Sequence, residues 1–221
     1  MKQFKAVIFD LDGTLLDTER VAQAAFFATC EELAVTPRRD LLLRCVGAAD
    51  AIARAVLREG YGPGLDIDIF FATWRRNFAV VSASAPAPLK EGALALLQAV
   101  GQLGLPMAVA TSSGTAAAVE KLERAGLLGR FRTVIGADQV HRPKPDPEVY
   151  LKAARCLGVD PGACLALEDS EYGVRAAHAA GMTVIQVPDM THPTADLRAL
   201  GHIVLSSLKD VAGYPFGANH G

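Results

Sequence analysis

Two patterns of hydrophobic and polar positions follow each other in the first part of this chain. Residues 6–9 (Ala-Val-Ile-Phe) form a short apolar run, which predicts a buried strand. After Asp17 the apolar residues recur at helical spacing, and glycines such as Gly47 and Gly60 separate the segments. This spacing predicts helices over residues 18–36, 40–46, 50–58 and 66–81, followed by a Pro- and Ala-rich connector over residues 82–88.

From residue 88 onward, helical segments alternate with short apolar runs. Helices are predicted over residues 91–103, 115–125, 146–157 and 173–180, and strands over residues 107–110, 133–135, 164–167 and 183–187, with an edge strand at 203–205. Such alternation favours a mainly parallel, doubly wound sheet. The prediction is an α/β fold, in which a Rossmann-like core over residues 1–17 and 87–221 carries an inserted α-helical cap domain over residues 18–86.

Composition narrows the class of protein. Of the 221 residues, 51% are hydrophobic and 21% charged, as in ordinary globular proteins, and the net charge of −2 disfavours a nucleic-acid polymer as partner. No segment approaches the ~18 apolar residues of a membrane span, and the apolar N-terminal run ends at Asp10, too early for a signal peptide. The four cysteines lack metal-ligand spacing, which indicates free thiols. We therefore expect a cytoplasmic protein, either monomer or homodimer.

Two carboxylates follow directly on the first predicted strand. Asp10 and Asp12 lie one residue apart, before Gly13 and Thr14. Asp-Gly is a common turn dipeptide, so a turn alone would explain part of this pattern. However, burying two carboxylates at a strand end costs several kcal/mol unless they are neutralised. Mg²⁺ binds carboxylates together with substrate phosphate oxygens, so the pattern also indicates a metal and phosphate site.

Three further strand ends carry polar groups, and ligands of doubly wound sheets bind at the carboxyl ends of the strands. Thr111 and Ser112 precede a predicted helix, where hydroxyl and N–H groups bind anions or simply cap the helix. Lys144 lies among three alternating prolines, which would hold it in a fixed direction. Glu168 and Asp169 end another apolar strand. Together these residues suit a site that binds a cation and a phosphate.

Four motifs in order carry a resemblance to a known family: FDLDGTLLDTE, VATSSG, RPKPDP and LEDSEYG. The chain resembles phosphatases of the haloacid dehalogenase superfamily, in the branch that includes β-phosphoglucomutases. The resemblance covers almost the whole chain, and the predicted helical insert is similar to the family's cap of the first type. Four spaced motifs are far more specific than any single match.

The resemblance implies a mechanism. Asp10 would be the nucleophile that forms an aspartyl-phosphate. Asp12 would be the general acid and base, a role that a like charge raising its pKa would help. Lys144 would also neutralise charge in the transition state. The implied ligands are Asp10, Asp12, Glu168 and Asp169 for Mg²⁺, and Thr111, Ser112 and Lys144 for the phosphoryl oxygens.

Three rival functions share parts of this pattern. A sugar-phosphate mutase resembling β-phosphoglucomutase would need a second phosphate site in the cap, where an arginine would fall at Asp50. An acidic residue there would repel the second phosphate. A 2-haloacid dehalogenase would need neither metal nor Asp12, and a binding protein without catalysis would lack one of the implied residues. The sequence therefore favours a Mg²⁺-dependent phosphatase.

The substrate is predicted only by class. A small, mainly apolar cap suits a small phosphomonoester, such as a sugar phosphate, phosphoglycolate or a nucleotide-like metabolite. Residues of the cap that could line the pocket are Arg44, Arg54, Trp74, Arg75 and Arg76. The five histidines have no metal-ligand spacing and are interpreted as structural or exposed.

Overall fold

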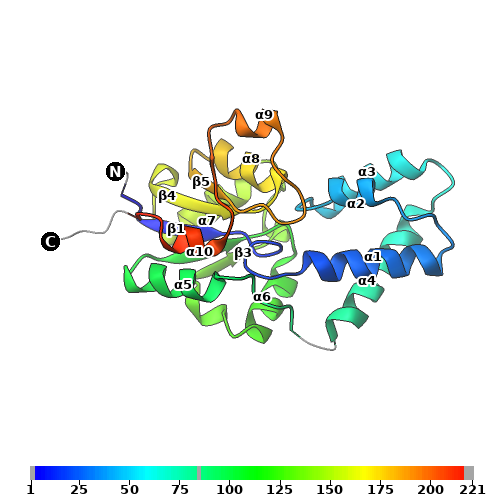
Figure 1. Ribbon diagram of the computed structural model, residues 1–221, viewed down its shortest axis with the longest axis horizontal. Helices are drawn as coiled ribbons and strands as arrows, with labels where there is room; N and C mark the ends of the chain where they lie inside the picture. Colours follow the sequence, from blue (N-terminus) through cyan, green and yellow to red (C-terminus); the bar gives the residue numbers. More distant parts are fainter. Residues whose placement is uncertain (1–2, 84–85, 217–221) are drawn as a thin grey trace.

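The computed structural model describes residues 3–83 and 86–216 (Figure 1). Within those residues a sheet of six parallel strands has the order β3-β2-β1-β4-β5-β6, so that β1 pairs with β2 on one side and β4 on the other. The strands are β1 (Ala6–Phe9), β2 (Met107–Ala110), β3 (Thr133–Ile135), β4 (Cys164–Glu168), β5 (Thr183–Gln186) and β6 (Ile203–Val204). The predicted doubly wound parallel sheet is confirmed.

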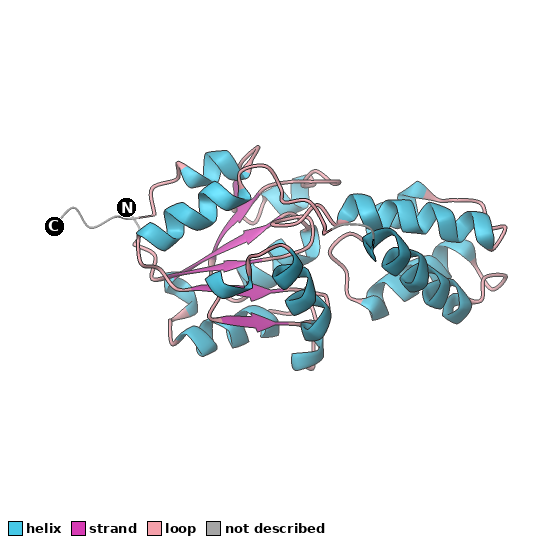
Figure 2. Ribbon diagram, turned by 90° about the horizontal axis from the view of Figure 1, so that it is seen from below, coloured by secondary structure: helices cyan, strands magenta, loops and turns pink. Residues whose placement is uncertain are grey.

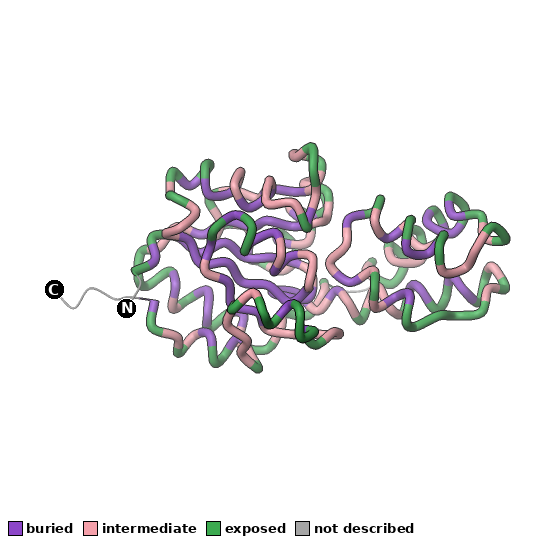
Figure 3. Tube along the Cα trace, turned by 90° about the horizontal axis from the view of Figure 1, so that it is seen from above, coloured by how far each residue is buried: buried purple, intermediate pink, exposed green. Residues whose placement is uncertain are grey.

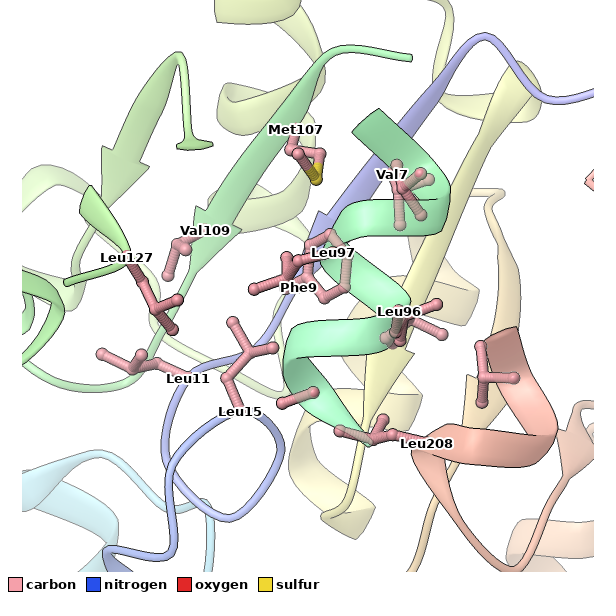
Figure 4. Packing of buried hydrophobic residues seen from close by; sticks show 14 of the residues in the cluster. Val7, Phe9, Leu11, Leu15, Leu96, Leu97, Met107, Val109, Leu127 and Leu208 are labelled. Atoms are coloured by element: carbon pink, nitrogen blue, oxygen red, sulfur yellow. The ribbon is translucent and has the colours of Figure 1, made fainter. Parts of the chain in front are cut away.

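Helices cover both faces of this sheet. They are α5 (Ala93–Gln102), α6 (Thr115–Arg124), α7 (Glu148–Leu157), α8 (Glu171–Ala179), α9 (Ala195–Arg198) and α10 (Leu208–Ala212), with short 3₁₀ turns η1 (Leu128–Arg130), η2 (Ala137–Gln139) and η3 (Pro161–Ala163). One face presents the larger side chains, such as Phe9 and Val109, to α5, α6 and α10 (Figure 4). The other face presents small ones, such as Ala108 and Ala166, to α7, α8 and α9. Because both faces are covered, the central strands are buried throughout.

The cap is a separate helical body beyond one end of the sheet (Figures 1 and 3). Its helices are α1 (Glu19–Glu32), α2 (Arg39–Arg44), α3 (Asp50–Tyr61) and α4 (Ile67–Ala83). They enclose a hydrophobic core of their own, in which the Phe26 ring packs edge-on against Phe70 and Trp74. The Trp74 indole N–H also donates to the Ala22 carbonyl, which ties α4 to α1.

The two connections between cap and core lie side by side. Leu16 forms an antiparallel bridge with Leu89, and the Asp17 N–H donates to the Pro88 carbonyl. This paired backbone lies close to the boundaries predicted for the cap domain, residues 18 and 86. The division into these two domains stays a prediction. Part of the predicted connector, residues 84–85, lies outside the described residues.

Capping hydroxyl groups account for three differences from the predicted elements. Helix α8 begins at Glu171, two residues earlier than predicted, because the Ser170 hydroxyl accepts a hydrogen bond from the Gly173 N–H as an N-cap. The short helices α9 and α10 were not predicted, and each begins after a capping hydroxyl, Thr194 and Ser207 respectively. Helices this short give too little hydrophobic periodicity to be recognised.

Two smaller observations bear on the predictions from composition. No described helix is long and apolar enough to cross a membrane. The free thiols are Cys30, Cys45, Cys156 and Cys164.

Candidate active site

The carboxyl ends of the strands face the cap (Figure 2). The predicted site residues gather at this end, around β1, β2 and β4. A cavity of about 750 Å³ lies there, lined by Asp10, Asp12, Thr111 and Ser112 from the core and by residues of the cap helices. The remaining predicted residues are buried beside it, since Lys144, Glu168 and Asp169 are each no more than 2% exposed. The structure thus brings all seven predicted residues to one end of the sheet.

A buried lysine joins two carboxylates at this end. The Lys144 Nζ donates to Asp10 Oδ1 at 2.7 Å and to Glu168 Oε1 at 2.5 Å. The loop before α7 delivers Lys144, while Asp10 and Glu168 come from the ends of β1 and β4. The Tyr150 hydroxyl also donates to Glu168 Oε1, at 2.6 Å. Lys144 is therefore held in place by Asp10 and Glu168 in the protein interior.

Glu168 is fully occupied by hydrogen bonds. Its Oε1 accepts from Lys144 and Tyr150, and its Oε2 accepts from the Ser170 hydroxyl at 3.1 Å and from the backbone N–H groups of Asp169 and Ser170. A Cβ at Gly173 would overlap the Glu168 carboxylate, at 1.8 Å from Oε1. The glycine of the fourth motif thus makes room for the carboxylate that anchors Lys144.

The charges of this cluster act on one another. Burial raises the pKa of Asp10 well above its usual range, and the neighbouring Glu168 and Asp12 carboxylates raise it further, while Lys144 opposes them. Burial alone would lower the pKa of Lys144, but the carboxylates of Asp10 and Glu168 raise it above its ordinary value. Lys144 is therefore a cation held against Asp10, and this contact favours the ionised form of Asp10.

Asp169 completes an acidic cluster that could hold a metal ion. Ligand atoms of Asp10, Glu168 and Asp169 all lie within 4.8 Å of one another. The Thr14 hydroxyl donates to Asp169 Oδ1 at 3.1 Å, whereas Asp169 Oδ2 is buried and has no hydrogen-bond partner among the described residues. A buried carboxylate oxygen without a partner is costly, and a hard cation with oxygen ligands would satisfy it.

The backbone leaves space beside that oxygen. Gly13 has a φ of 84°, in the region that favours glycine. A Cβ at this position would lie 2.4 Å from Asp169 Oδ2. The donor set and the space both fit Mg²⁺, which takes oxygen ligands and retains water molecules.

Asp12 accepts hydrogen bonds from one cation and two hydroxyl groups, although the Asp10 carboxylate is also near it. The Lys121 Nζ and the Thr18 hydroxyl donate to its Oδ1 at 2.6 Å and 2.7 Å, and the Ser113 hydroxyl donates to its Oδ2 at 2.7 Å. Burial alone would raise the pKa of Asp12, but the Lys121 charge and these hydrogen bonds lower it below the ordinary value. A like charge that raises this pKa would help the acid role, but here the cation that faces Asp12 has the opposite effect.

The segment after β2 contacts both the site and the cap. The Thr111 hydroxyl lies 3.5 Å from Asp12 Oδ2 and is buried, and it accepts a hydrogen bond from the Ser113 N–H. The Ser112 hydroxyl points to the cap, where it donates to the Gly47 carbonyl at 2.9 Å. Ser112 is thus a point of contact between core and cap as well as a predicted phosphate ligand.

Comparisons with known proteins agree with this geometry. Residues 4–181 match the family described as haloacid dehalogenase-like hydrolase. The chain belongs to this family. Over 212 residues it is 32% identical to the fructose-1-phosphate phosphatase YqaB of Escherichia coli. The match covers 84% of this chain and 97% of YqaB.

Solved structures share the whole fold of this hydrolase. The phosphate complex of CbbY from Rhodobacter sphaeroides has a TM-score of 0.76 at 29% identity, covering 95% of this chain and 96% of that one. A β-phosphoglucomutase of Clostridium difficile has a TM-score of 0.79 at 19% identity, covering 95% and 93%, which shows a common fold alone. The predicted family, the branch of phosphatases and β-phosphoglucomutases, and the enzyme class are confirmed.

Sequence reasoning about the hydrolase missed several polar residues of the site. Ser113 and Thr18 both lie inside recognised motifs, so their proximity to Asp12 could have been inferred from those motifs. Lys121 and Tyr150 lie on α6 and α7 at positions that read as ordinary helix surface and core. No local signal distinguishes them, because their roles arise from helices folding back over the strand ends.

Fewer of the five named cap residues line the cavity than the sequence suggested. Trp74 and Arg75 line the cavity. Arg44, Arg54 and Arg76 are absent from its described lining and instead pair with acidic residues on the cap surface. The partners of these three arginines are Glu59, Asp68 and Glu32, in that order.

Proposed function

We propose that this hydrolase is a Mg²⁺-dependent phosphatase that removes phosphate from a small phosphomonoester through Asp10. The observation that carries the proposal is the contact of Asp10 Oδ1 with Lys144 Nζ, 2.7 Å apart at the end of β1 beside the cavity. A carboxylate held against a cation can attack an electrophile whose charge the same cation neutralises. A sugar phosphate is the preferred substrate class, because fructose 1-phosphate is the substrate named for one relative.

The first step transfers the phosphoryl group to the protein. An Asp10 oxygen forms a bond to phosphorus while the bond from phosphorus to the ester oxygen breaks, giving an aspartyl-phosphate. The departing oxygen takes a proton from Asp12, and the alcohol leaves. The Asp12 seen here is held as a carboxylate by Lys121, Thr18 and Ser113, so it must exchange these donors for a proton and the substrate oxygen.

The second step returns the protein to its starting state. A water molecule gives a proton to the Asp12 carboxylate and attacks phosphorus, and the bond from phosphorus to Asp10 breaks. Inorganic phosphate and the free Asp10 carboxylate are formed. The ionised Asp12 that the structure favours is the form required as base in this step.

The other polar groups of the site would bind the phosphoryl oxygens and the metal ion and would neutralise negative charge. Lys144, Thr111 and the Ser112 N–H would bind phosphoryl oxygens, and Glu168 would keep Lys144 in place. Asp10, Asp169 and the Asp12 carbonyl would hold Mg²⁺, with Glu168 close to the metal or its waters. When bound, Mg²⁺ would offset the negative charge of these carboxylates and of the phosphate.

A sugar-phosphate mutase is the second candidate, since a β-phosphoglucomutase shares the fold. A mutase would transfer the phosphoryl group from Asp10 to a second hydroxyl of the substrate instead of to water. Asp50, at the first turn of α3, lies in the cavity lining where a second phosphate would have to bind. Its negative charge favours the phosphatase.

The proposed substrate class also bears on the location and the partners of the enzyme. We propose that the enzyme acts on a phosphorylated metabolite in the cytoplasm, without a nucleic-acid or membrane partner, as a monomer or homodimer.

The test is phosphate release from a panel of phosphomonoesters, with Mg²⁺ and with EDTA. The panel includes sugar phosphates, phosphoglycolate and nucleoside monophosphates, and β-glucose 1-phosphate is also scored for isomerised product. We expect Mg²⁺-dependent phosphate release that Asp10→Asn abolishes. Isomerisation without phosphate release would identify a mutase, and release that persists in Asp10→Asn would remove Asp10 as nucleophile.

A further inference from the structure

A buried glutamine at the end of β5 contacts the backbone of a predicted metal ligand. The Gln186 side chain is buried, and its Nε2 donates to the Asp169 carbonyl at 2.9 Å. The backbone pairing of β4 with β5 ends one residue earlier, where the Val187 N–H donates to the Glu168 carbonyl at 2.7 Å. The Gln186 side chain therefore extends this pairing by one carbonyl, and it satisfies a buried acceptor that would be costly to leave unpaired.

This contact is one of three that orient Asp169. The Asp169 N–H donates to Glu168 Oε2 at 3.2 Å, and Asp169 Oδ1 accepts from the Thr14 hydroxyl at 3.1 Å. With the carbonyl held by Gln186, Asp169 Oδ2 is the polar atom of this residue that has no partner among the described residues. It lies beside Gly13, where the cation would bind. The three contacts thus leave one carboxylate oxygen free for the metal.

A histidine fixes the direction of the Gln186 amide. A carbonyl only accepts hydrogen bonds, so the amide nitrogen of Gln186 faces Asp169 and its oxygen faces His202. His202 Nε2 lies 2.8 Å from Gln186 Oε1 and must therefore carry the proton that this oxygen accepts. Since His202 directly precedes β6, the chain of hydrogen bonds runs from the edge of the sheet to the acidic cluster.

We propose that Gln186 is a positioning residue for Mg²⁺ and that His202 holds it in place. Gln186 lies outside the group of ligand atoms and acts through the backbone of Asp169. Outer partners of metal ligands orient those ligands, and their loss commonly lowers metal affinity about 10–100-fold. Here the loss would leave the Asp169 carbonyl unpaired and its carboxylate free to turn away from the metal. This proposal rests on the Mg²⁺ site of the proposed function.

The experiment measures Mg²⁺ binding by calorimetry and by the rise in Tm that Mg²⁺ causes, with Mg²⁺ alone as the probe. Gln186→Leu keeps the approximate size of the side chain and removes both hydrogen bonds. We expect the Kd for Mg²⁺ to rise at least about tenfold, and the rise in Tm to become smaller. The Mg²⁺ concentration for half-maximal phosphate release should increase by the same factor, while the rate at saturating Mg²⁺ stays within about threefold of the wild type.

A matched control lies beside β3, the strand at the opposite edge of the sheet from β6. Gln139 Nε2 donates to the Val134 carbonyl at 3.1 Å and to the Thr115 hydroxyl at 2.8 Å, and Gln139 lies outside the acidic cluster. Gln139→Leu therefore removes the same kind of bond from a side-chain amide to a backbone carbonyl. Its Kd for Mg²⁺ should stay within about twofold of the wild type, whatever its Tm in EDTA.

Two variants at His202 keep the test decisive if Gln186→Leu does not fold. His202→Gln retains an N–H donor toward Gln186 Oε1, so its Kd for Mg²⁺ should stay within about twofold of the wild type. His202→Leu has no such donor, and its Kd should exceed that of His202→Gln at least about threefold. If Gln186→Leu does not fold, a smaller difference between these two variants overturns the proposal. If it does fold, a smaller difference removes His202 alone.

A purely structural role for Gln186 predicts a different result. If Gln186→Leu raises the Kd for Mg²⁺ less than about tenfold, or no more than Gln139→Leu does, the proposal is overturned even where the Tm in EDTA falls. A wild type that binds no Mg²⁺ would remove the metal site of the proposed function and the role of Gln186 with it. Mg²⁺ binding without phosphate release would contradict the proposed reaction alone, and the Kd values would still decide the role of Gln186.

Discussion

The charged groups of the core and those of the cap differ in burial and in partners. At the end of β1 and β4, Lys144 is 2% exposed and bridges Asp10 and Glu168. In the cap, Arg75 and Asp50 form a pair whose side chains are 64% and 61% exposed. Breaking a buried ion pair costs several kcal/mol, whereas an exposed pair contributes little to stability. The core charges are therefore held in fixed contacts, while the exposed cap pair contributes little to stability and can rearrange at low cost.

The largest expected effect is the loss of the nucleophile in the core. Asp10→Asn leaves the shape of the side chain but cannot form the aspartyl-phosphate, so turnover should fall at least ~10⁴-fold, about 5.5 kcal/mol of transition-state stabilisation. Phosphate release gives the rate, and circular dichroism checks that the fold is kept. Asp50→Asn serves as the comparison in the cap and should retain turnover of a monophosphate. A core variant that keeps a tenth of the wild-type rate would contradict the role of Asp10.

The next largest effect concerns the stability of the cap, which we expect to come from its hydrophobic core rather than from its surface ion pairs. Phe26 is fully buried and contacts Phe70 and Trp74, so Phe26→Ala should lower the free energy of unfolding by about 3–5 kcal/mol. Denaturant unfolding measures this change. Glu32→Gln, which breaks the exposed pair with Arg76, should change it by less than ~1 kcal/mol. Equal losses in the two variants would remove the contrast between packing and charge in the cap.

A third effect returns to the core and concerns the metal. Asp169→Asn should raise the Mg²⁺ concentration for half-maximal activity by about 100-fold, because altering even the outer partners of metal ligands costs about 10–100-fold. Because bound ligand stabilises the folded state, Mg²⁺ should raise the Tm of the wild type and not that of the variant. Asp138→Asn is a suitable control, since Asp138 lines the cavity but lies outside the acidic cluster. An unchanged Mg²⁺ titration would remove Asp169 from the metal site.

The metal-free protein should also respond to pH. Burial and the neighbouring carboxylates raise the pKa of Asp169 and Asp10 in the folded state above the unfolded values. The folded state then binds these protons more tightly, so its stability is fully present below the unfolded pKa and is lost as pH rises toward the folded pKa. Thermal unfolding in EDTA should show this decline above about pH 4, and Mg²⁺ should reduce it. A stability that rises with pH in EDTA would contradict the raised pKa values.

The sequence predicted the core site better than the cap site for a physical reason. Asp10, Thr111 and Asp169 each follow directly on a strand, so the topology of the sheet brings them together, and the proline-framed loop before α7 adds Lys144. Lys121 was missed because it reaches Asp12 from the second turn of α6, which depends on how that helix packs. In the cap, the pairing of Asp50 with Arg75 joins α3 to α4. A contact between two packed helices cannot be inferred from the spacing of residues within either helix.

The smallest expected effect concerns Lys121, one of the site residues that were not predicted from the sequence. Its charge, against the effect of burial, lowers the pKa of Asp12, so Lys121→Met should let that pKa rise. The part of the pH–rate profile that reports Asp12 should then move to higher pH, with a modest change in the maximal rate. Lys152→Met is the control, since Lys152 donates to the Gln139 carbonyl and has no contact with Asp12 among those described. A profile that stays in place, or moves to lower pH, would show that Lys121 only packs beside Phe78 of the cap and does not tune Asp12.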